Sequence, residues 1–257
     1  MQILKIGQML GGSNAPSTAV YENIYSLDFD GVDDYVDLGD SNDFSFGNGS
    51  TDTPFSLSFW YKSSDLTSKP VFTKTTTVSA EREYYLYFGS GDKLVMVFFD
   101  YSSGGFIAGT TGALTSTQGA WTHASITYDG SGANTGIEIY INGVLQSLTR
   151  SGSSYTAMEN TSYPLWVGGW QTLSSYFLGN LDEISLWSKE LSLAEVVGIY
   201  NSGDPTNLAS ESGLIGYWRN GDTAGTSVYP TIEDYSSNSN DGTMTNMASG
   251  DIVTVVP

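Results

Sequence analysis

The stretch FLGNLDEISLWSKELSLAEV, Phe177–Val196, decides the fold because it joins a β-type run to the start of a helix. Its first half predicts a strand. Residues Leu191–Tyr200 then predict a short helix, because Ser192 can cap the first turn and Glu195 stands at the third helical position. We expect Asn201–Gly203 to end the helix. This helix, near residues 192–201, interrupts an otherwise β-type pattern.

Short strand-like runs separated by turn residues occupy the rest of the chain. In FSLSFWYK, Phe55–Lys62, alternate residues are apolar, and Trp60 lies on the opposite face from them. The predicted strands are Tyr25–Asp30, Asp34–Leu38, Phe55–Lys62, Tyr84–Phe88, Lys93–Phe99, Trp121–Tyr128, Ile137–Ile141, Val144–Leu148, Pro164–Gly168, Phe177–Trp187, Leu214–Trp218, Ser227–Tyr235, Gly242–Met247 and Ile252–Val256. Many short strands and one helix predict an all-β antiparallel sandwich, with residues 22–257 forming a single domain.

The composition excludes several function classes. The 257 residues include 28 acidic and 9 basic side chains, for a net charge of −19. We therefore expect no nucleic-acid partner and no docking on anionic lipid, since both need a basic face. The absence of cysteine and the single histidine exclude disulfides, thiolate metal sites and His-rich metal sites. Without a secretory signal or an apolar run of about 18 residues, we expect a protein made in the cytoplasm, with no membrane insertion.

Four further motifs precede Phe177–Val196 in the sequence. They are SLDFDGVDDYVDLG at Ser26–Gly39, WTHASITYDG at Trp121–Gly130, IYINGVLQ at Ile139–Gln146 and LWVGGW at Leu165–Trp170. Together with Phe177–Val196, this set resembles the laminin-G-like jelly rolls of the concanavalin A-like lectin/glucanase type. The resemblance spans roughly residues 25–200. It implies an antiparallel jelly-roll sandwich.

The two ends of the chain carry separate expectations. GLIGYW at Gly213–Trp218 and the Asp/Ser/Asn-rich run Ile232–Thr243 resemble a segment that usually precedes the first strand in this family. We expect residues 213–247 to fill that edge-strand place from the C-terminal side, which makes the tail part of the domain. Residues 1–21 form an N-terminal arm with an apolar stretch, which we expect to insert into a neighbouring subunit.

The aspartates near the first strands suggest a metal site. A loop that starts at Asp28 is not an EF-hand, because it lacks the required glycine and glutamate. The family resemblance implies one structural Ca²⁺ held by Asp30 and Asp182, with carbonyl groups from the loop that contains Asn48 and Gly49. The alternative is that these aspartates form turns and keep the surface soluble.

The sequence offers little to a catalytic mechanism. His123 has no accompanying nucleophile or orienting acid, so we expect a hydrogen-bonded strand residue. Glycanases carry alternating acids on one strand, whereas Asp182 and Glu183 are adjacent and should point to opposite faces. We therefore expect no catalytic residue and no enzyme.

Exposed aromatic residues are the remaining candidates for a binding site. Trp170 follows two glycines, Tyr101 lies beside Asp100 in a Ser/Gly turn, and Trp60 could line a sheet face. Each is a candidate for stacking on a sugar ring. The alternative is a core role, which we expect for Trp166, Trp187 and Trp218 and which Trp60 could share.

These observations predict a non-enzymatic virion protein of a tailed phage, either a head decoration or a tail-fibre component. Compact laminin-G-like jelly rolls with a DEISLW strand and an SSNSNDG tail resemble domains of such proteins. The expected partners are other virion subunits, further copies of the chain in a trimer, and host-surface glycans. The alternative is a free, extracellular carbohydrate-binding or adhesion module of a bacterium.

Overall fold

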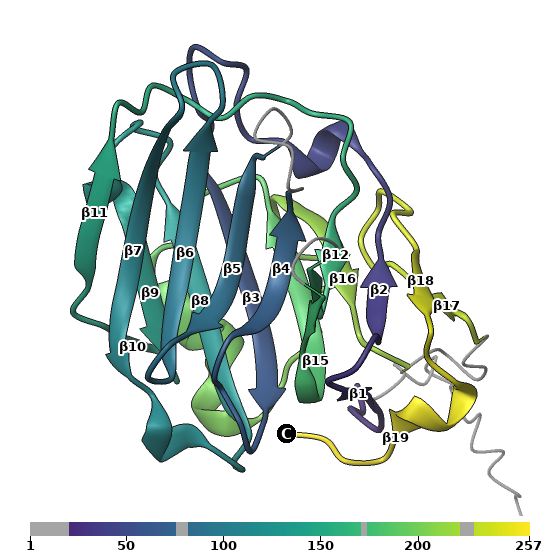
Figure 1. Ribbon diagram of the computed structural model, residues 1–257. Helices are drawn as coiled ribbons and strands as arrows, with labels where there is room; N and C mark the ends of the chain where they lie inside the picture. Colours follow the sequence, from purple (N-terminus) through teal and green to yellow (C-terminus); the bar gives the residue numbers. More distant parts are fainter. Residues whose placement is uncertain (1–20, 76–81, 171–173, 222–228) are drawn as a thin grey trace, which may run out of the picture.

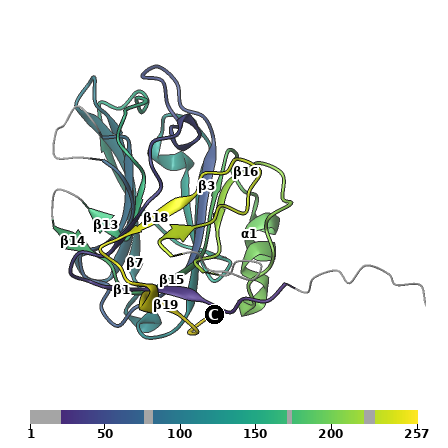
Figure 2. The same ribbon diagram turned by 90° about the vertical axis from the view of Figure 1, so that its right-hand side faces the viewer.

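The computed structural model describes residues 21–75, 82–170, 174–221 and 229–257. In these ranges two antiparallel sheets lie face to face, and a short helix covers the outer face of one of them (Figure 1, Figure 2). The all-β antiparallel sandwich predicted from the strand pattern is therefore confirmed. The expected N-terminal arm, except its last residue, lies outside the described residues.

The eight-stranded sheet consists of β1 (Ser26–Asp30), β3 (Phe55–Lys62), β8 (Thr122–Tyr128), β9 (Ile137–Ile141), β10 (Val144–Leu145), β15 (Leu178–Trp187), β16 (Leu214–Trp218) and β19 (Ile252–Val253). Its order is β10-β9-β8-β3-β15-β1-β19. Strand β15 pairs with β3 on one side, and with β1 and then β16 on the other. The strand part of Phe177–Val196 therefore lies at the centre of this sheet.

The nine-stranded sheet consists of β2 (Tyr35–Asp37), β4 (Lys69–Lys74), β5 (Tyr84–Gly89), β6 (Lys93–Asp100), β7 (Gly105–Ala113), β11 (Thr149–Ser153), β12 (Trp166–Val167), β17 (Thr231–Ile232) and β18 (Gly242–Thr245). Its order is β11-β7-β6-β5-β4-β12-β2-β18-β17. A separate hairpin of β13 (Gly169–Trp170) and β14 (Ser175–Tyr176) projects from its outer face (Figure 2).

The main core lies between the two sheets and is rich in aromatic rings. Phe55 stacks on Phe46 with ring centroids 4.0 Å apart. The same ring lies within 6 Å of Tyr84, Phe98 and Tyr128, which come from both sheets. Each buried aromatic side chain removes about 150–250 Å² of surface from water, so this cluster is a large part of what holds the sheets together.

The helix α1 (Leu193–Tyr200) lies on the outer face of the eight-stranded sheet (Figure 2). The Ser192 hydroxyl accepts a hydrogen bond from the Glu195 backbone N–H, and the Glu195 carboxylate accepts one from the Ser192 N–H. Asn201 ends the helix with φ at 43°. The predicted helix and its capping box are confirmed. No helix in the described part of the chain is long and apolar enough to cross a bilayer. Short 3-10 turns occur at Asn42–Phe44, Thr115–Thr117, Asn134–Gly136, Asn201–Gly203 and Ser249–Asp251.

The C-terminal segment pairs with both sheets. Strand β16 lies beside β15, β19 pairs with β1, and β18 pairs with β2. Strand β17 then forms the edge of the nine-stranded sheet. The edge position expected for the tail is therefore filled by β17 and β18 in the nine-stranded sheet, whereas β16 pairs with β15 in the eight-stranded sheet, beyond the residues that pair with β1.

Some strands differ from the predictions. Strands β4, β7 and β11 were not foreseen, because proline or glycine interrupts their patterns. The Gly-containing run Ser151–Ser153, which is typical of a hairpin tip, lies instead in β11, where Gly152 pairs with Ile107 of β7. A Cβ atom on Gly152 would lie 2.8 Å from the carbonyl oxygen of Phe106, so glycine permits the two backbones to approach closely.

Candidate functional site

The outer face of the nine-stranded sheet carries a second set of aromatic side chains. Strand β5 reads YYLYFG, in which Tyr84, Leu86 and Phe88 are buried in the core. The alternate residues, Tyr85 and Tyr87, point to the outer face, which faces the viewer in Figure 1. This strand therefore places aromatic side chains on both faces of its sheet.

The strand register extends this aromatic face across β6 and β7. Val97 lies opposite both Tyr85 and Ala108, and Phe99 lies opposite Phe106. Residues directly opposite one another have Cβ atoms about 5 Å apart, so these side chains contact each other in rows across the sheet. The result is a continuous apolar floor with aromatic rings at its edges.

Trp170 forms a wall of this surface from the β13–β14 hairpin. Its ring centroid lies 4.6 Å from that of Tyr85 and 5.8 Å from that of Tyr87. The Thr73 hydroxyl on β4 donates a 2.7 Å hydrogen bond to the carbonyl of Gly169, the residue before Trp170. Trp170 is half-buried and lies in the short strand β13.

The aromatic rings of β5, β6 and β7 line a groove of about 420 Å³, called the outer-face groove below, and Trp170 borders it through its contacts with Tyr85 and Tyr87. Its lining consists of Tyr85, Tyr87, Gly89, Ser90, Lys93, Val95, Val97, Phe99, Phe106, Ala108, Thr110 and Ser151. A second hollow of about 330 Å³ shares Phe99 and Phe106 with it and is further lined by Arg82 and Tyr101. Two of the three predicted glycan-stacking residues, Trp170 and Tyr101, therefore lie on this one face.

Arg82 and Tyr101 define the end of the surface at the second hollow. The Arg82 guanidinium carbon lies 5.5 Å from the ring centroid of Phe99, within the range of a cation–π contact. Burial raises the pKa of Tyr85 to about 12, while the nearby Arg82 lowers it, so the hydroxyl stays protonated at neutral pH. Tyr101 is 43% exposed, and its backbone N–H donates to the Glu159 carboxylate at 2.8 Å.

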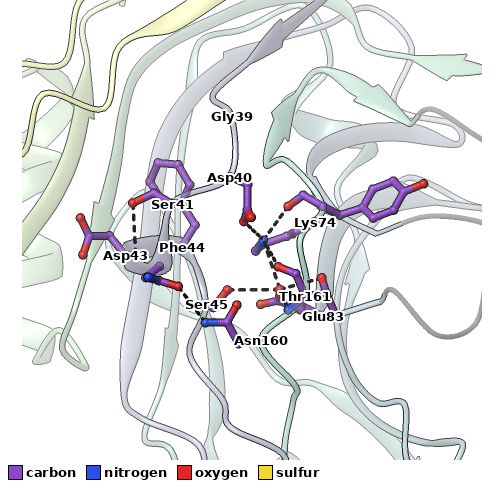
Figure 3. A network of polar contacts seen from close by, with 12 residues as sticks. Gly39, Asp40, Ser41, Asp43, Phe44, Ser45, Lys74, Glu83, Asn160 and Thr161 are labelled. Carbon is purple, nitrogen blue, oxygen red and sulfur yellow. Dashed lines mark hydrogen bonds and ion pairs between the residues drawn. The ribbon is translucent and has the colours of Figure 1, made fainter.

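A buried ion pair fixes the ends of the two strands below this surface (Figure 3). Lys74 at the end of β4 and Glu83 just before β5 are both fully buried, with Nζ and Oε1 3.1 Å apart. The same ammonium contacts Asp40 at 2.9 Å and donates to the carbonyl of Tyr163 at 2.5 Å. Glu83 also accepts from the backbone N–H and the hydroxyl of Thr161.

This network has an electrostatic cost that its hydrogen bonds offset. Burial raises the pKa of Glu83, whereas Lys74 and the Thr161 bonds lower it. Both charges are out of water, so each depends on the other for compensation. Because the pair joins β4 to the residue between Arg82 and Tyr84, it sets where β5 begins and how the outward tyrosines are presented.

The four calcium ligands expected from the resemblance do not form one site. Asp30 lies opposite Leu178 on β15, and Asp182 is four residues further along that strand, about 13 Å away at the usual rise per residue. Asp182 is fully buried and accepts hydrogen bonds from Asn23 and from the Glu183 N–H. One Ca²⁺ needs its oxygens within about 2.6 Å, so both aspartates cannot bind it.

The loop expected to complete the calcium site has other partners. The Asn48 side chain accepts hydrogen bonds from the N–H groups of Ser50 and Thr51, which closes the loop on itself. The Gly49 N–H donates to the carbonyl of Met158 at 2.7 Å. This expected ligand set is therefore corrected, and calcium binding as such stays a prediction.

Three carboxylates in the described part of the chain lie close enough to share a cation. Asp30, Asp33 and Asp34 present oxygens within 4.8 Å of one another. Asp34 accepts a hydrogen bond from the Asp30 N–H, and Asp30 accepts one from the Val32 N–H. Burial and the neighbouring carboxylates raise the pKa of Asp34 to about 6. These bonds are those of aspartates that shape a turn.

Trp60, the third predicted stacking residue, lies under α1. Its side chain is 3% exposed, and its ring lies 5.9 Å from that of Tyr200. The alternation in β3 does place Trp60 on the outer face of its sheet, but the helix covers that face. The ring is therefore not available to a ligand, which corrects this candidate.

His123 occupies the same covered layer. Its Nε2 is 2.7 Å from the Ser58 hydroxyl, and its side chain is fully buried. The prediction of a hydrogen-bonded strand histidine is confirmed. Glu183 also departs from simple alternation: a bulge in β15 places it at φ 48°, where Tyr217 donates to its carboxylate.

Tyr85, Tyr87, Phe99 and Phe106 were missed in the sequence as site residues. The signal was present in β5 and β6, where residues on both alternating faces are apolar or aromatic. A strand of that kind is usually read as buried on both faces. Only the sheet order shows that one of these faces is left open.

Comparisons with known proteins agree with this architecture. A family model described as the concanavalin A-like lectin/glucanases superfamily matches residues 30–197. No curated protein is similar enough in sequence to count as a relative. A candidate carbohydrate binding protein from Bacteroides ovatus ATCC 8483 superposes with a TM-score of 0.58 at 17% identity, over 91% of this chain and 60% of that one.

Two further solved structures are similar over a smaller part. The binding domain of Paraclostridial Mosquitocidal Protein 1 has a TM-score of 0.50 at 16% identity, over 70% of this chain and 47% of that one. Domains LG4-5 of the mouse laminin alpha1 chain have a TM-score of 0.45 at 14% identity, over 66% and 43%. The chain spans at most 60% of the length of each of the three structures. At these identities the likeness concerns the fold.

Proposed function

The chain belongs to the concanavalin A-like lectin/glucanase superfamily, and from this premise we propose that it is a non-enzymatic carbohydrate-binding protein. The ligand lies in the outer-face groove of the nine-stranded sheet. One observation carries this proposal: an open apolar groove of about 420 Å³, large enough for a small ligand, is lined by Tyr85 and Tyr87, and the Trp170 ring packs against both tyrosines at its border.

The chemistry of the groove suits sugar rings. A pyranose has an apolar face of C–H groups and a polar rim of hydroxyls, so it stacks on an aromatic ring while its rim hydrogen-bonds. The Trp170 and Tyr87 rings supply the stacking surface, and the hydroxyls of Ser90, Thr110 and Ser151 line the groove beside them. The fold-level likeness to a candidate carbohydrate binding protein supports the same function.

The lining of the groove favours binding over hydrolysis. Glycoside hydrolysis requires two carboxyl groups on either side of the scissile bond. None of the residues that line the outer-face groove is Asp or Glu. The second hollow holds Asp100, but its oxygens accept hydrogen bonds from Ser103, Thr156 and Ser102, which hold its pKa down to about 2 despite burial.

A glycan microarray, followed by calorimetry with the best ligand, tests the proposal. We expect saturable binding by the wild type and a loss of at least tenfold in affinity for Trp170→Ala. Leu193→Ala is the matched control, because Leu193 is 56% exposed on α1 at the other side of the molecule. Binding that survives Trp170→Ala, or an array without any bound glycan, would contradict the proposal.

We further propose a more specific role for this carbohydrate-binding protein, as a head decoration or tail-fibre component on the virion of a tailed phage. The net charge of −19 and the DEISLW and SSNSNDG motifs support it. A free bacterial adhesion module is the alternative. Light scattering separates the two: a trimer supports the virion role, and a monomer that binds glycan by itself supports the free module.

A further inference from the structure

The outer-face groove differs in charge from the rest of the molecule. The chain has 28 acidic and 9 basic residues. The lining of the groove nevertheless includes Lys93 and no Asp or Glu. On a molecule that is acidic overall, this aromatic groove therefore has no carboxylate in its lining and one cationic side chain. That contrast points to the charge of the ligand.

Lys93 has no carboxylate partner among the described residues. Lys69, Lys74 and Lys189 each form an ion pair with an acidic side chain. Lys93 forms none in the described part of the chain, and its side chain is exposed at the first position of β6. Its ammonium group can therefore reach a ligand in the groove without breaking an existing pair.

A second cation lies at the far end of the same surface. Arg82 lies over the ring of Phe99, which both hollows share. Lys93 begins β6 and Phe99 lies near its end, so about 20 Å of strand separates the two ends at the usual rise per residue. The aromatic floor lies between these cations, a length that suits several linked sugar units better than one.

The hydrogen-bonding groups of the groove also favour acceptors on the ligand. Neutral sugar hydroxyls are usually fixed by carboxylate or amide oxygens, which accept their protons. The lining contains no Asp, Glu, Asn or Gln, and both Lys93 and Arg82 can only donate. The Tyr85 and Tyr87 hydroxyls stay protonated, because burial raises both of their pKa values. The site therefore offers donors in excess.

The carboxylates of Asp100 and Glu159 lie near the second hollow, and both accept hydrogen bonds from backbone N–H groups. Asp100 lines the second hollow beside Arg82. It is 1% exposed, and backbone N–H groups of Ser103 and Thr156 donate to its two oxygens. The Asp100 carboxylate therefore holds the loop after β6, and Asp100 does not line the outer-face groove.

Resting on the proposed function, we propose that the ligand is an acidic glycan, a polymer whose sugars carry carboxylate or sulfate groups. Its sugar rings lie on Trp170 and the floor tyrosines. One of its anionic groups lies at Lys93, at one end of the floor. The shared chemistry is an anionic oxygen cluster that accepts charge-assisted hydrogen bonds.

The test uses polymers that differ only in charge. On the same microarray, polygalacturonate is compared with its fully methyl-esterified form, and dextran sulfate with dextran, beside other neutral, uronate-bearing and sulfated glycans. At about 150 mM salt, where long-range repulsion from the acidic surface is screened beyond about 8 Å, we expect at least tenfold tighter binding of acidic than of matched neutral glycans. Binding of uronates alone or of sulfates alone identifies which anionic group is recognised.

Variants attribute the preference to the groove. Lys93→Met should weaken binding of the acidic glycan at least threefold more than it weakens binding of a neutral glycan. Lys62→Met removes the same charge from β3 in the other sheet and should change neither. Equal binding of acidic and neutral glycans, or acidic binding that Lys93→Met leaves intact, would overturn this inference while the proposed function stands. An array without any bound glycan would overturn both.

Discussion

Thr73 and Gly169 join two segments that are 96 residues apart in the sequence, through a buried 2.7 Å hydrogen bond from the threonine hydroxyl to the glycine carbonyl. Thr73 belongs to β4 in the nine-stranded sheet, whereas Gly169 begins the projecting hairpin. The bond therefore sets the height of Trp170 over Tyr85. It makes Thr73 a positioning residue for the outer-face groove.

Thr73→Val tests this role, because valine keeps the shape and removes the hydroxyl. The Gly169 carbonyl would lose its partner, at a cost of about 1–3 kcal/mol of unfolding free energy. We expect glycan affinity to fall severalfold, and Thr73→Ser to restore it. Calorimetry and urea unfolding measure both effects, and full affinity in Thr73→Val would remove Thr73 from the site.

The turn that leads into Trp170 depends on Gly168, at φ 77°. An added Cβ would lie 2.4 Å from the buried ring of Phe29. Gly168→Ala therefore combines left-handed strain with overpacking, and we expect a loss of about 3 kcal/mol or more in unfolding free energy. Gly104→Ala is the control at φ 70°, where no atom lies within 4 Å. It should lose only about 1–2 kcal/mol. Equal losses would contradict the contact with Phe29.

The buried ion pair below the groove predicts a large mutational effect. Lys74→Met would leave the carboxylate of Glu83 buried without its cation, which costs about 3–5 kcal/mol of unfolding free energy. Lys69→Met breaks the exposed pair with Asp65, whose N···O distance is 3.8 Å, and should cost less than about 1 kcal/mol. Urea unfolding compares the two. Similar losses would show that the Lys74 network is not needed.

His123 predicts how stability depends on pH. Burial lowers its pKa from 6.5 to about 3, so the folded protein keeps it neutral while the unfolded chain takes up a proton below pH 6.5. Its contribution to stability is complete above pH 6.5 and is lost as the pH falls toward 3. At pH 4.5 the loss amounts to about 2–3 kcal/mol relative to pH 7.

His123→Gln provides the comparison, because glutamine does not titrate and can still bond Ser58. The raised pKa of Asp34 acts in the opposite direction, but it is common to both proteins and cancels in the difference. Urea midpoints at pH 7 and pH 4.5 give that difference. If wild type and variant lose the same stability on acidification, His123 is not the titrating group.

Local pattern was enough to predict most of the strands. β3 and β9 coincide with their predicted ranges because their alternation and flanking turns are clear. Ser192 and Glu195 likewise predicted the helix, because a capping box depends only on residues that are close in the sequence. In contrast, β7 and β11 contain Gly105 and Gly152, at which an added Cβ would meet the backbone of the neighbouring strand. The sequence of β7 or β11 alone does not show which strand will lie beside it.

The candidate site shows the same limit. Trp170 and Tyr101 could be picked out because they stand beside glycines and polar turn residues. The prediction that Trp60 stacks on a sugar ring was wrong, because α1, which covers this residue, is far away in the sequence. Tyr85 and Tyr87 were missed for the reverse reason, since nothing in their own strand says that the layer outside it is empty.

The pairing of the first strand with the last segment has a consequence for synthesis on the ribosome. The hydroxyl of Ser26 on β1 donates to the carbonyl of Val255, 229 residues later in the sequence. While translation proceeds, β1 and β2 lack the neighbours that β19 and β18 supply. Contacts this remote make folding slow, and unpaired sheet edges invite aggregation until they close. On a nascent chain of this protein, β1 and β2 therefore stay without these neighbours until β18 and β19 have left the exit tunnel.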